Sequence, residues 1–129
     1  MADSELIERN IRVSGPAGGL SRELVAVIDT GASHCQIPED VAGEIGAPFD
    51  YQERILLATG RDLLRDVVGI VVEMDGYVVH TTATLAPPGS PALLGKIALH
   101  QMGLGVDPVE NRLIKQVVYL LSESGWPTF

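Results

Sequence analysis

The residues best suited to chemistry form one short cluster, Asp29-Thr30-Gly31, which is followed by Ala32 and Ser33. A carboxylate can act as a general acid or base when it lies on a loop at the end of a strand, where functional groups are commonly presented. The three-residue pattern alone is weak, since it arises by chance in a chain of this length on the order of a few per cent of the time. Its context adds weight, because the apolar run Leu24–Ile28 directly precedes it and predicts a buried strand.

A second element of the same kind lies further along the chain. Leu93-Leu94-Gly95 follows a β-rich run and precedes a short helix candidate, Lys96–Met102. The Asp29-Thr30-Gly31 cluster is likewise preceded by a β-rich run and followed by a helix candidate, Pro38–Gly46. The order of these elements is therefore repeated, although the matching residues are too few to demonstrate a duplication.

Other reactive side chains show no organised pattern. The chain has one cysteine, Cys35, and its histidines are His34, His80 and His100, without the spacing of metal ligands. We interpret these residues as ordinary polar or core side chains and expect neither a metal nor a cofactor. Cys35 paired with a distant histidine, as a thiol nucleophile, is an alternative for which no orienting residue is evident.

The elements that would position the cluster are mostly strands. Val67–Met74 and Tyr77–Leu85 flank Asp75-Gly76, and a two-residue Asp-Gly between β-rich runs predicts a hairpin. Arg112–Leu121 predicts a C-terminal strand. Pro38–Gly46 begins with proline and acidic residues and ends at glycine, as helices do. The sequence therefore indicates an all-β domain with one or two short helices.

Length and charge limit the possible functions. The 129 residues fit a single domain, 1–129, whose termini, 1–10 and 122–129, are expected to be flexible. Nine Lys and Arg against 17 Asp and Glu give a net charge of −8, which argues against nucleic acid or a membrane surface as the partner. The N-terminus lacks the apolar segment of a signal peptide. With a single cysteine, this predicts a cytoplasmic protein.

The combined motifs resemble those of the retroviral-like (retropepsin-like) single-domain aspartic proteases. The resemblance covers most of the chain, from about Leu24 to Ile114, and its C-terminal part is similar to bacterial members of this clan. It implies a closed β-barrel of the acid protease fold with a flap hairpin, assembled as a homodimer. The segments that carry it are Val27–Ser33, Leu57–Arg61, Leu93-Leu94-Gly95, Gly103–Pro108 and Asn111–Ile114.

The resemblance implies catalytic roles for three residues. Asp29 would activate a water, Thr30 would bond across the base of the carboxylate pair, and Gly31 would let backbone approach carboxylate and substrate. Two carboxylates that share a proton have split pKa values, so one acts as acid and the other as base. Since this chain carries a single Asp-Thr-Gly, the pair requires two chains in an isologous homodimer.

The resemblance also implies substrate-binding positions. These are Ala32 and Ser33 beside the carboxylate, and Ala58, Thr59 and Gly60 at the tip of a flap, although the latter segment also fits an ordinary hairpin turn. Such a flap would close over an extended peptide and exclude water.

Two positions depart from the retroviral pattern. Ser33 and Lys96 stand where retroviral enzymes commonly carry an acid and an arginine, so that ion pair is missing. We expect an aspartic endopeptidase acting on extended polypeptides. The alternative is a non-catalytic dimeric peptide-binding module with the same fold.

Overall fold

The computed structural model describes residues 6–116, and strands dominate this part of the chain. The two helices are α1 (Glu39–Ile45) and α2 (Lys96–Gln101). The strands are β1 (Glu8–Ser14), β2 (Ser21–Ile28), β3 (Cys35–Pro38), β4 (Phe49–Leu56), β5 (Asp62–Met74), β6 (Tyr77–Ala86), β7 (Ala92–Leu94), β8 (Leu104–Asp107) and β9 (Arg112–Lys115). The predicted all-β domain with short helices is therefore confirmed.

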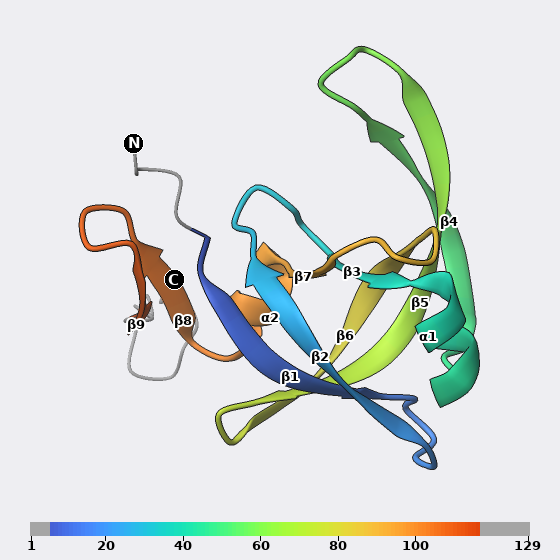
Figure 1. Ribbon diagram of the computed structural model, residues 1–129, viewed down its shortest axis with the longest axis horizontal. Helices are drawn as coiled ribbons and strands as arrows, with labels where there is room; N and C mark the ends of the chain where they lie inside the picture. The colour runs from blue at the N-terminus through green and yellow to red at the C-terminus, as the bar shows by residue number, and fades with distance from the viewer. Residues whose placement is uncertain (1–5, 117–129) are drawn as a thin grey trace, which may run out of the picture.

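Six strands close into a barrel. They pair in the order β1-β2-β7-β3-β6-β5, and β5 pairs back to β1 through Arg12↔Glu73 to Ser14↔Val71. Closure leaves no free edge on this ring, and Figure 1 shows β1, β2, β5 and β6 running diagonally across the body of the molecule. β4 is added outside the ring and pairs with β5 only.

Alternating side chains of the strands fill the barrel. Ile70, Val72 and Met74 of β5 are buried, together with Ile11 and Val13 of β1. This spacing of two is what a strand with one inward face produces. The predicted strand Leu24–Ile28 is present, but only Ala26 in it is fully buried and Val25 is 57% exposed, because alternate residues face outward.

Local turn and cap signals agree with the structure. Asp75 and Gly76 take positive φ values of 51° and 87° and join β5 to β6, which confirms the predicted hairpin. Both predicted helices are present, and Gly46 ends α1 in the left-handed conformation.

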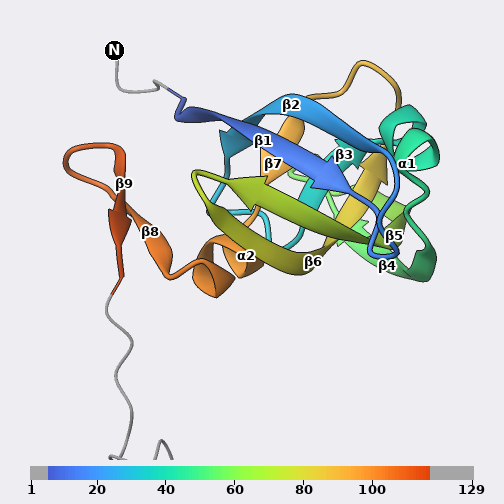
Figure 2. The same cartoon turned by 90° about the horizontal axis from the view of Figure 1, so that it is seen from below.

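The structure adds detail at both ends of the described chain. Residues 8–10, assigned above to a flexible terminus, pair with β2 through Glu8↔Val27 to Asn10↔Val25. Of the predicted strand Arg112–Leu121, the part Arg112–Lys115 is present as β9, Gln116 is not in a strand, and residues 117–121 lie outside the described residues. β8 and β9 form a hairpin that stands apart from the barrel beyond α2 (Figures 1 and 2).

A second hairpin projects from the barrel, and it is built by β4 and the first part of β5. Only the later part of β5, from Val67, pairs with β6, so the preceding residues extend beyond the barrel wall. Figure 1 shows this hairpin rising on the same side of the barrel as the loop that follows β2. Its turn, residues 57–61, is the predicted flap segment.

Among the described residues, no helix is long and apolar enough to cross a membrane.

Candidate active site

Asp29 lies at the point where β2 leaves the barrel. Its backbone N–H donates a hydrogen bond to the Leu94 carbonyl at 3.0 Å, and its carbonyl accepts one from the N–H of Ala32 at 3.2 Å. Its carboxylate oxygen Oδ1 accepts a hydrogen bond from the N–H of Gly31 at 3.0 Å. The carboxylate is therefore oriented by its own turn, and it remains half-buried rather than sealed in the core.

The loop that carries Asp29 arches over β7. Residues 29–34 connect β2 to β3, yet these strands do not pair with each other, because β7 lies between them. β7 is parallel to β2, with Val27↔Leu93 and Ile28↔Leu94, and antiparallel to β3. The sequence motifs Asp29-Thr30-Gly31 and Leu93-Leu94-Gly95 are thus adjacent in space.

Gly95 is the point where the loop and α2 meet most closely. A Cβ atom placed on Gly95 would lie 2.2 Å from the His34 carbonyl oxygen, so only glycine fits without a backbone shift. The first two N–H groups of α2 donate to this loop, from Lys96 to the Ala32 carbonyl at 2.7 Å and from Ile97 to the Ser33 carbonyl at 3.1 Å. The loop therefore satisfies N–H groups that a helix leaves free at its start.

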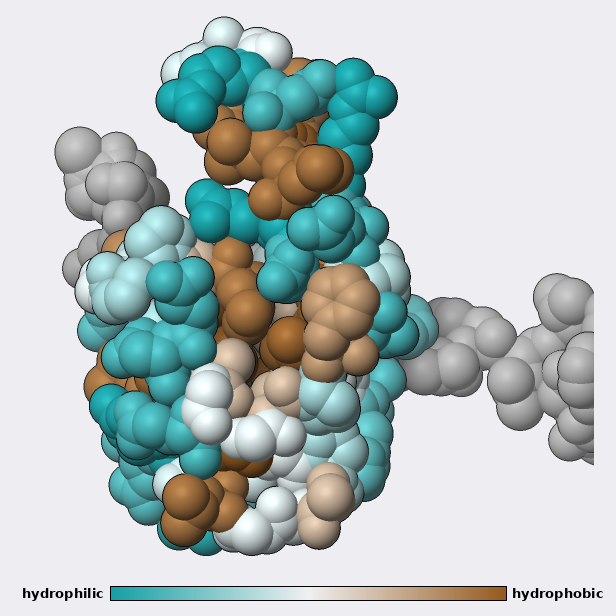
Figure 3. All heavy atoms as spheres, turned by 90° about the vertical axis from the view of Figure 1, so that its right-hand side faces the viewer, coloured by the Kyte–Doolittle hydropathy of each residue, from teal (hydrophilic) through white to brown (hydrophobic). Residues whose placement is uncertain are grey.

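A groove of about 390 Å³ runs between this loop and the projecting hairpin. The loop contributes Gly31, Ala32 and Ser33, which the sequence analysis had selected. The residues that complete the lining are His34, Gln36, Glu53, Arg54, Ile55, Thr84 and Leu93. Figure 3 shows the hollow between the hairpin, at the top of that view, and the body of the barrel.

The tip of the hairpin does not line this groove. Ala58, Thr59 and Gly60 are exposed at the turn, which is closed by a hydrogen bond from the Gly60 N–H to the Leu57 carbonyl at 2.8 Å. Gly60 has φ of +89°, a conformation that glycine adopts without strain. The structure therefore brings the predicted residues of the loop to the groove and leaves those of the tip outside it.

Thr30 belongs to a different cavity. This cavity, of about 360 Å³, lies on the side of α2 and β8, and its lining includes Thr30, Lys96, His100 and Gln116. Lys96 makes no ion pair within residues 6–116, which agrees with the missing acid at position 33.

The thiol of Cys35 is not available as a nucleophile. Cys35 is 2% exposed, and burial raises its pKa to about 11. A reactive cysteine needs an accessible thiolate, so the alternative of a thiol nucleophile is not supported. Within the described residues, no group of three or more His, Cys, Asp or Glu side chains is placed to hold a metal.

Several residues of the groove escaped the sequence analysis. His34 was interpreted as an ordinary polar or core residue, and the groove-lining Glu53 and Ile55 of β4 were not singled out. The alternation of Glu53 and Ile55 places them on one face of β4. That face reaches the loop only because β5 pairs with β4 along its first part and with β6 from Val67 onward.

Comparisons with known proteins identify the fold. No protein family model and no curated protein sequence matches this chain. The EIAV protease, solved with an inhibitor, has a TM-score of 0.64 at 14% identity, covering 83% of this chain and 97% of its own. A retropepsin-like aspartic protease from Rickettsia conorii has a TM-score of 0.54 at 20% identity, covering 84% of this chain and 89% of its own.

A third structure supports the same conclusion. The simian foamy virus protease has a TM-score of 0.54 at 19% identity, covering 74% of this chain and 94% of its own. The chain therefore has the retropepsin-like fold, as the sequence motifs implied.

Proposed function

We propose that this protein is an aspartic endopeptidase that works as a homodimer with one Asp29 from each subunit. The observation that carries the proposal is the position of Asp29 on the retropepsin-like fold. It follows β2, accepts a hydrogen bond from the Gly31 N–H, and directly precedes the loop whose residues Gly31, Ala32 and Ser33 line the groove beneath a projecting hairpin. A carboxylate in that position is suited to general acid–base chemistry on a bound peptide.

The proposed reaction uses the two carboxylates in different protonation states. The ionised Asp29 takes a proton from a water molecule, whose oxygen attacks the carbonyl carbon of the peptide bond. The protonated Asp29 of the other subunit donates its proton to the carbonyl oxygen, which gives a gem-diol intermediate. The first Asp29 then passes the proton it took from water to the amide nitrogen, one hydroxyl of the gem-diol returns a proton to the second Asp29, and the C–N bond breaks to release an amine and a carboxylic acid. Thr30 would bond across the base of the carboxylate pair, and Gly31 would let the backbone approach the carboxylate and the substrate.

Dimerisation is part of the proposal because the chain contains a single Asp-Thr-Gly. Thr30 and Gly31 are exposed, so their surface is free to meet a second copy. An isologous contact would place the two Asp29 side chains on either side of one two-fold axis. Sedimentation velocity over a range of concentrations tests this point, and a protein that stays monomeric while cleaving peptides would contradict it.

The proposed substrate is an extended polypeptide. The groove beside Ala32 and Ser33 is bounded by the strand β4, and an extended peptide can make backbone hydrogen bonds in such a site. The exposed tip residues Ala58, Thr59 and Gly60 would reach the substrate when the hairpin closes. The single, buried cysteine suits a cytoplasmic setting, which belongs to the same proposal.

A non-catalytic peptide-binding dimer is the second candidate. The observation that favours it concerns positions 33 and 96, where Ser33 and Lys96 replace an acid and an arginine that retroviral enzymes commonly carry. Within residues 6–116, Lys96 makes no ion pair. Such a module would bind peptides in the same groove without hydrolysing them.

The Asp29→Asn variant distinguishes these two candidates. We expect wild-type protein to cleave members of a peptide library, and Asp29→Asn to lose at least about a thousandfold in rate, because amide cannot replace carboxylate in proton transfer. Asp50→Asn, an exposed carboxylate in β4, is the matched control and should retain activity. Cleavage by Asp29→Asn at the wild-type rate would refute the proposal, and binding without cleavage by wild type would favour the second candidate.

A further inference from the structure

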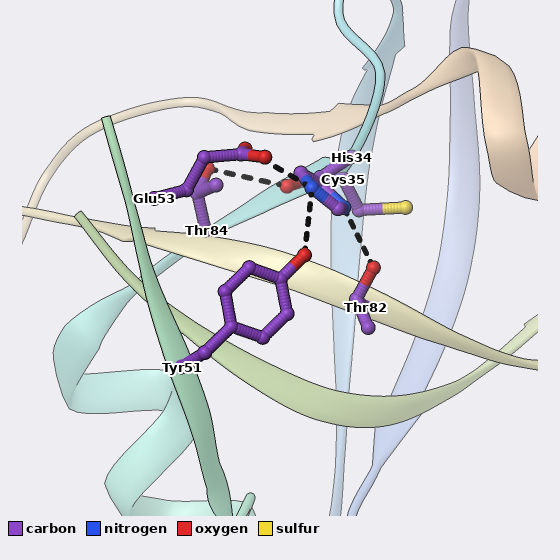
Figure 4. Close-up of polar contacts among 6 residues, drawn as sticks. All are labelled: His34, Cys35, Tyr51, Glu53, Thr82 and Thr84. Carbon is purple, nitrogen blue, oxygen red and sulfur yellow. Dashed lines mark hydrogen bonds and ion pairs between the residues drawn. The ribbon is translucent and has the colours of Figure 1, made fainter. Parts of the chain in front are cut away.

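His34 connects three parts of the molecule that are distant in sequence. It lies at the end of the loop that carries Asp29. Its Nδ1 is 2.7 Å from Thr82 Oγ1 of β6, and its Nε2 is 3.0 Å from Glu53 Oε2 and 3.3 Å from the hydroxyl of Tyr51, both in β4. Figure 4 shows the imidazole between these three side chains.

The chemistry of these partners decides which ring nitrogen of His34 donates a hydrogen bond and which one accepts. An ionised Glu53 carboxylate only accepts hydrogen bonds, so Nε2 of His34 must carry a proton. In the neutral ring, Nδ1 then accepts from the Thr82 hydroxyl, and in the protonated ring it donates to the same oxygen. Both forms of His34 therefore keep the contacts, and the side chain, 12% exposed, is fully partnered.

Few polar side-chain contacts join the projecting hairpin to the rest of the described chain: those of Tyr51 and Glu53 with His34, and one from Arg65 Nη1 to the Leu85 carbonyl at 3.3 Å. β4 is the last strand of the sheet, and its outer edge pairs with no strand among the described residues. Gln52 and Arg54 bond to Asp66 and Asp62 within the hairpin itself. In the described part of the chain, the side chains of β4 make polar contacts beyond the hairpin only through Tyr51 and Glu53 to His34.

We propose that His34 is a positioning residue that ties the base of the flap hairpin to the Asp29 loop and so sets the width of the peptide groove. Only the expected effect of His34 on cleavage kinetics rests on the proposed function; its effect on the hairpin does not. His34 and Glu53 both line the groove, so their contact joins its two walls. Loss of this contact would release β4 from the loop while Asp29 keeps its own hydrogen bonds to Gly31 and Leu94.

Hydrogen exchange measured by mass spectrometry tests, without reference to catalysis, whether the contacts of His34 hold the hairpin against the Asp29 loop. We call these contacts the tether. We expect His34→Ala and Glu53→Ala each to accelerate amide exchange over residues 49–66 by at least about threefold, since an edge strand opens more readily when its side-chain contacts are lost. The double variant should exchange no faster than His34→Ala, because that substitution already removes the contact to Glu53 together with the one to Tyr51. His80→Ala is the matched control, since its ring in β6 is exposed and forms no side-chain hydrogen bond or ion pair within residues 6–116.

The outcomes separate the tether from the proposed activity. Unchanged exchange over residues 49–66 in folded His34→Ala, or additive effects in the double variant, would overturn the tether. If His34→Ala does not fold, His34→Gln is measured instead. Its amide N–H can still reach Glu53 but cannot bond Thr82 as well, so the inference requires an acceleration smaller than that of Glu53→Ala.

Steady-state kinetics of peptide cleavage then tests whether His34 sets the width of the groove. For a peptide that wild type cleaves, His34→Ala should raise KM at least about fivefold while kcat changes less than twofold, because the flap binds substrate and Asp29 is undisturbed. A fall in kcat with unchanged KM would contradict a role in setting the groove. If no peptide is cleaved by wild type, the proposed function fails, whereas the exchange data still decide whether His34 holds the hairpin.

Discussion

The backbone N–H of Asp29 donates a hydrogen bond to the carbonyl of Leu94, so the Asp29-Thr30-Gly31 motif is bonded directly to the Leu93-Leu94-Gly95 motif. This bond continues the parallel pairing of β2 with β7, in which Ile28 stands opposite Leu94. The position of the carboxylate is therefore set by a strand that neighbours β2 in the barrel but lies far from it in the sequence. Changes at either glycine motif should therefore act on the same site.

Gly95→Ala should destabilise the fold. A Cβ atom at this position would lie 2.2 Å from the carbonyl oxygen and 2.5 Å from the carbonyl carbon of His34, and backbone atoms cannot rotate away. We expect a loss of about 3 kcal/mol in the free energy of unfolding, measured by chemical denaturation at one protein concentration.

Gly43→Ala is the matched control for that loss. Gly43 lies in α1, and a Cβ there would meet nothing within 4 Å. Alanine favours helix over glycine, so this variant should gain about 0.5–1 kcal/mol. Equal stability of the two variants would show that the close approach of Gly95 to His34 has no energetic weight.

Gly31→Ala should impair the reaction while leaving the fold intact. Its Cβ would lie 3.3 Å from Oδ1 of Asp29, the same oxygen that accepts the Gly31 N–H. A shift of the carboxylate by a few tenths of an ångström would misalign the two Asp29 side chains. We expect kcat to fall about tenfold and the free energy of unfolding to change by less than about 1 kcal/mol, because the site is exposed. An unchanged kcat would mean that the orientation of Asp29 does not depend on this turn.

Gly60 tests the contribution of the flap tip. Its φ of +89° is unfavourable for a β-branched residue but is more readily adopted by asparagine. Gly60→Val should therefore raise KM about fivefold or more, and Gly60→Asn should stay within about twofold of wild type. Steady-state kinetics on one cleaved peptide measures both, and equal KM values for the two variants would argue against a role for the backbone conformation at the tip.

The buried thiol of Cys35 predicts a stability change at alkaline pH. Burial raises its pKa from the ordinary 9.0 to about 11, so the folded state keeps the proton that the unfolded state loses. Its contribution is complete below pH 9 and is lost as the pH rises from about 9 to 11, amounting to about 2–3 kcal/mol. Comparing pH-dependent unfolding of wild type with Cys35→Ala isolates this contribution from those of lysine and tyrosine. Parallel curves for the two proteins over this range would contradict it.

The same thiol should resist chemical modification. Cys35 is 2% exposed, so an aromatic disulfide reagent at pH 8 should react with it only after the protein is unfolded. Rapid labelling of the native protein would indicate that β3 opens readily.

Elements governed by local interactions were predictable from the sequence. The Asp75-Gly76 hairpin follows from the turn that these two residues favour, and the end of α1 follows from the left-handed conformation of Gly46. The two glycine motifs were recognisable because each combines an apolar run with a turn. Burial was less predictable, since the apolar run Leu24–Ile28 alternates between the core and the outer face of β2.

The groove was only partly predictable, because its two walls come from separate regions of the chain. Ala32 and Ser33 belong to the recognised motif, but Glu53 and His34 lie close together only through the long β5 strand, which leaves the barrel and supports β4. No local pattern specifies that distance, since it depends on register between strands far apart in sequence.

The sequence by itself determined the candidate carboxylate Asp29, the need for a second copy if it works as a pair, and the short-range turns around it. The tertiary structure alone decided that β7 would lie between β2 and β3, that Gly95 would touch His34, and that His34 would bridge the loop to the flap. The reason is physical: turns and caps depend on a few neighbouring residues, whereas barrel closure selects one register among many, and that register determines which side chains meet.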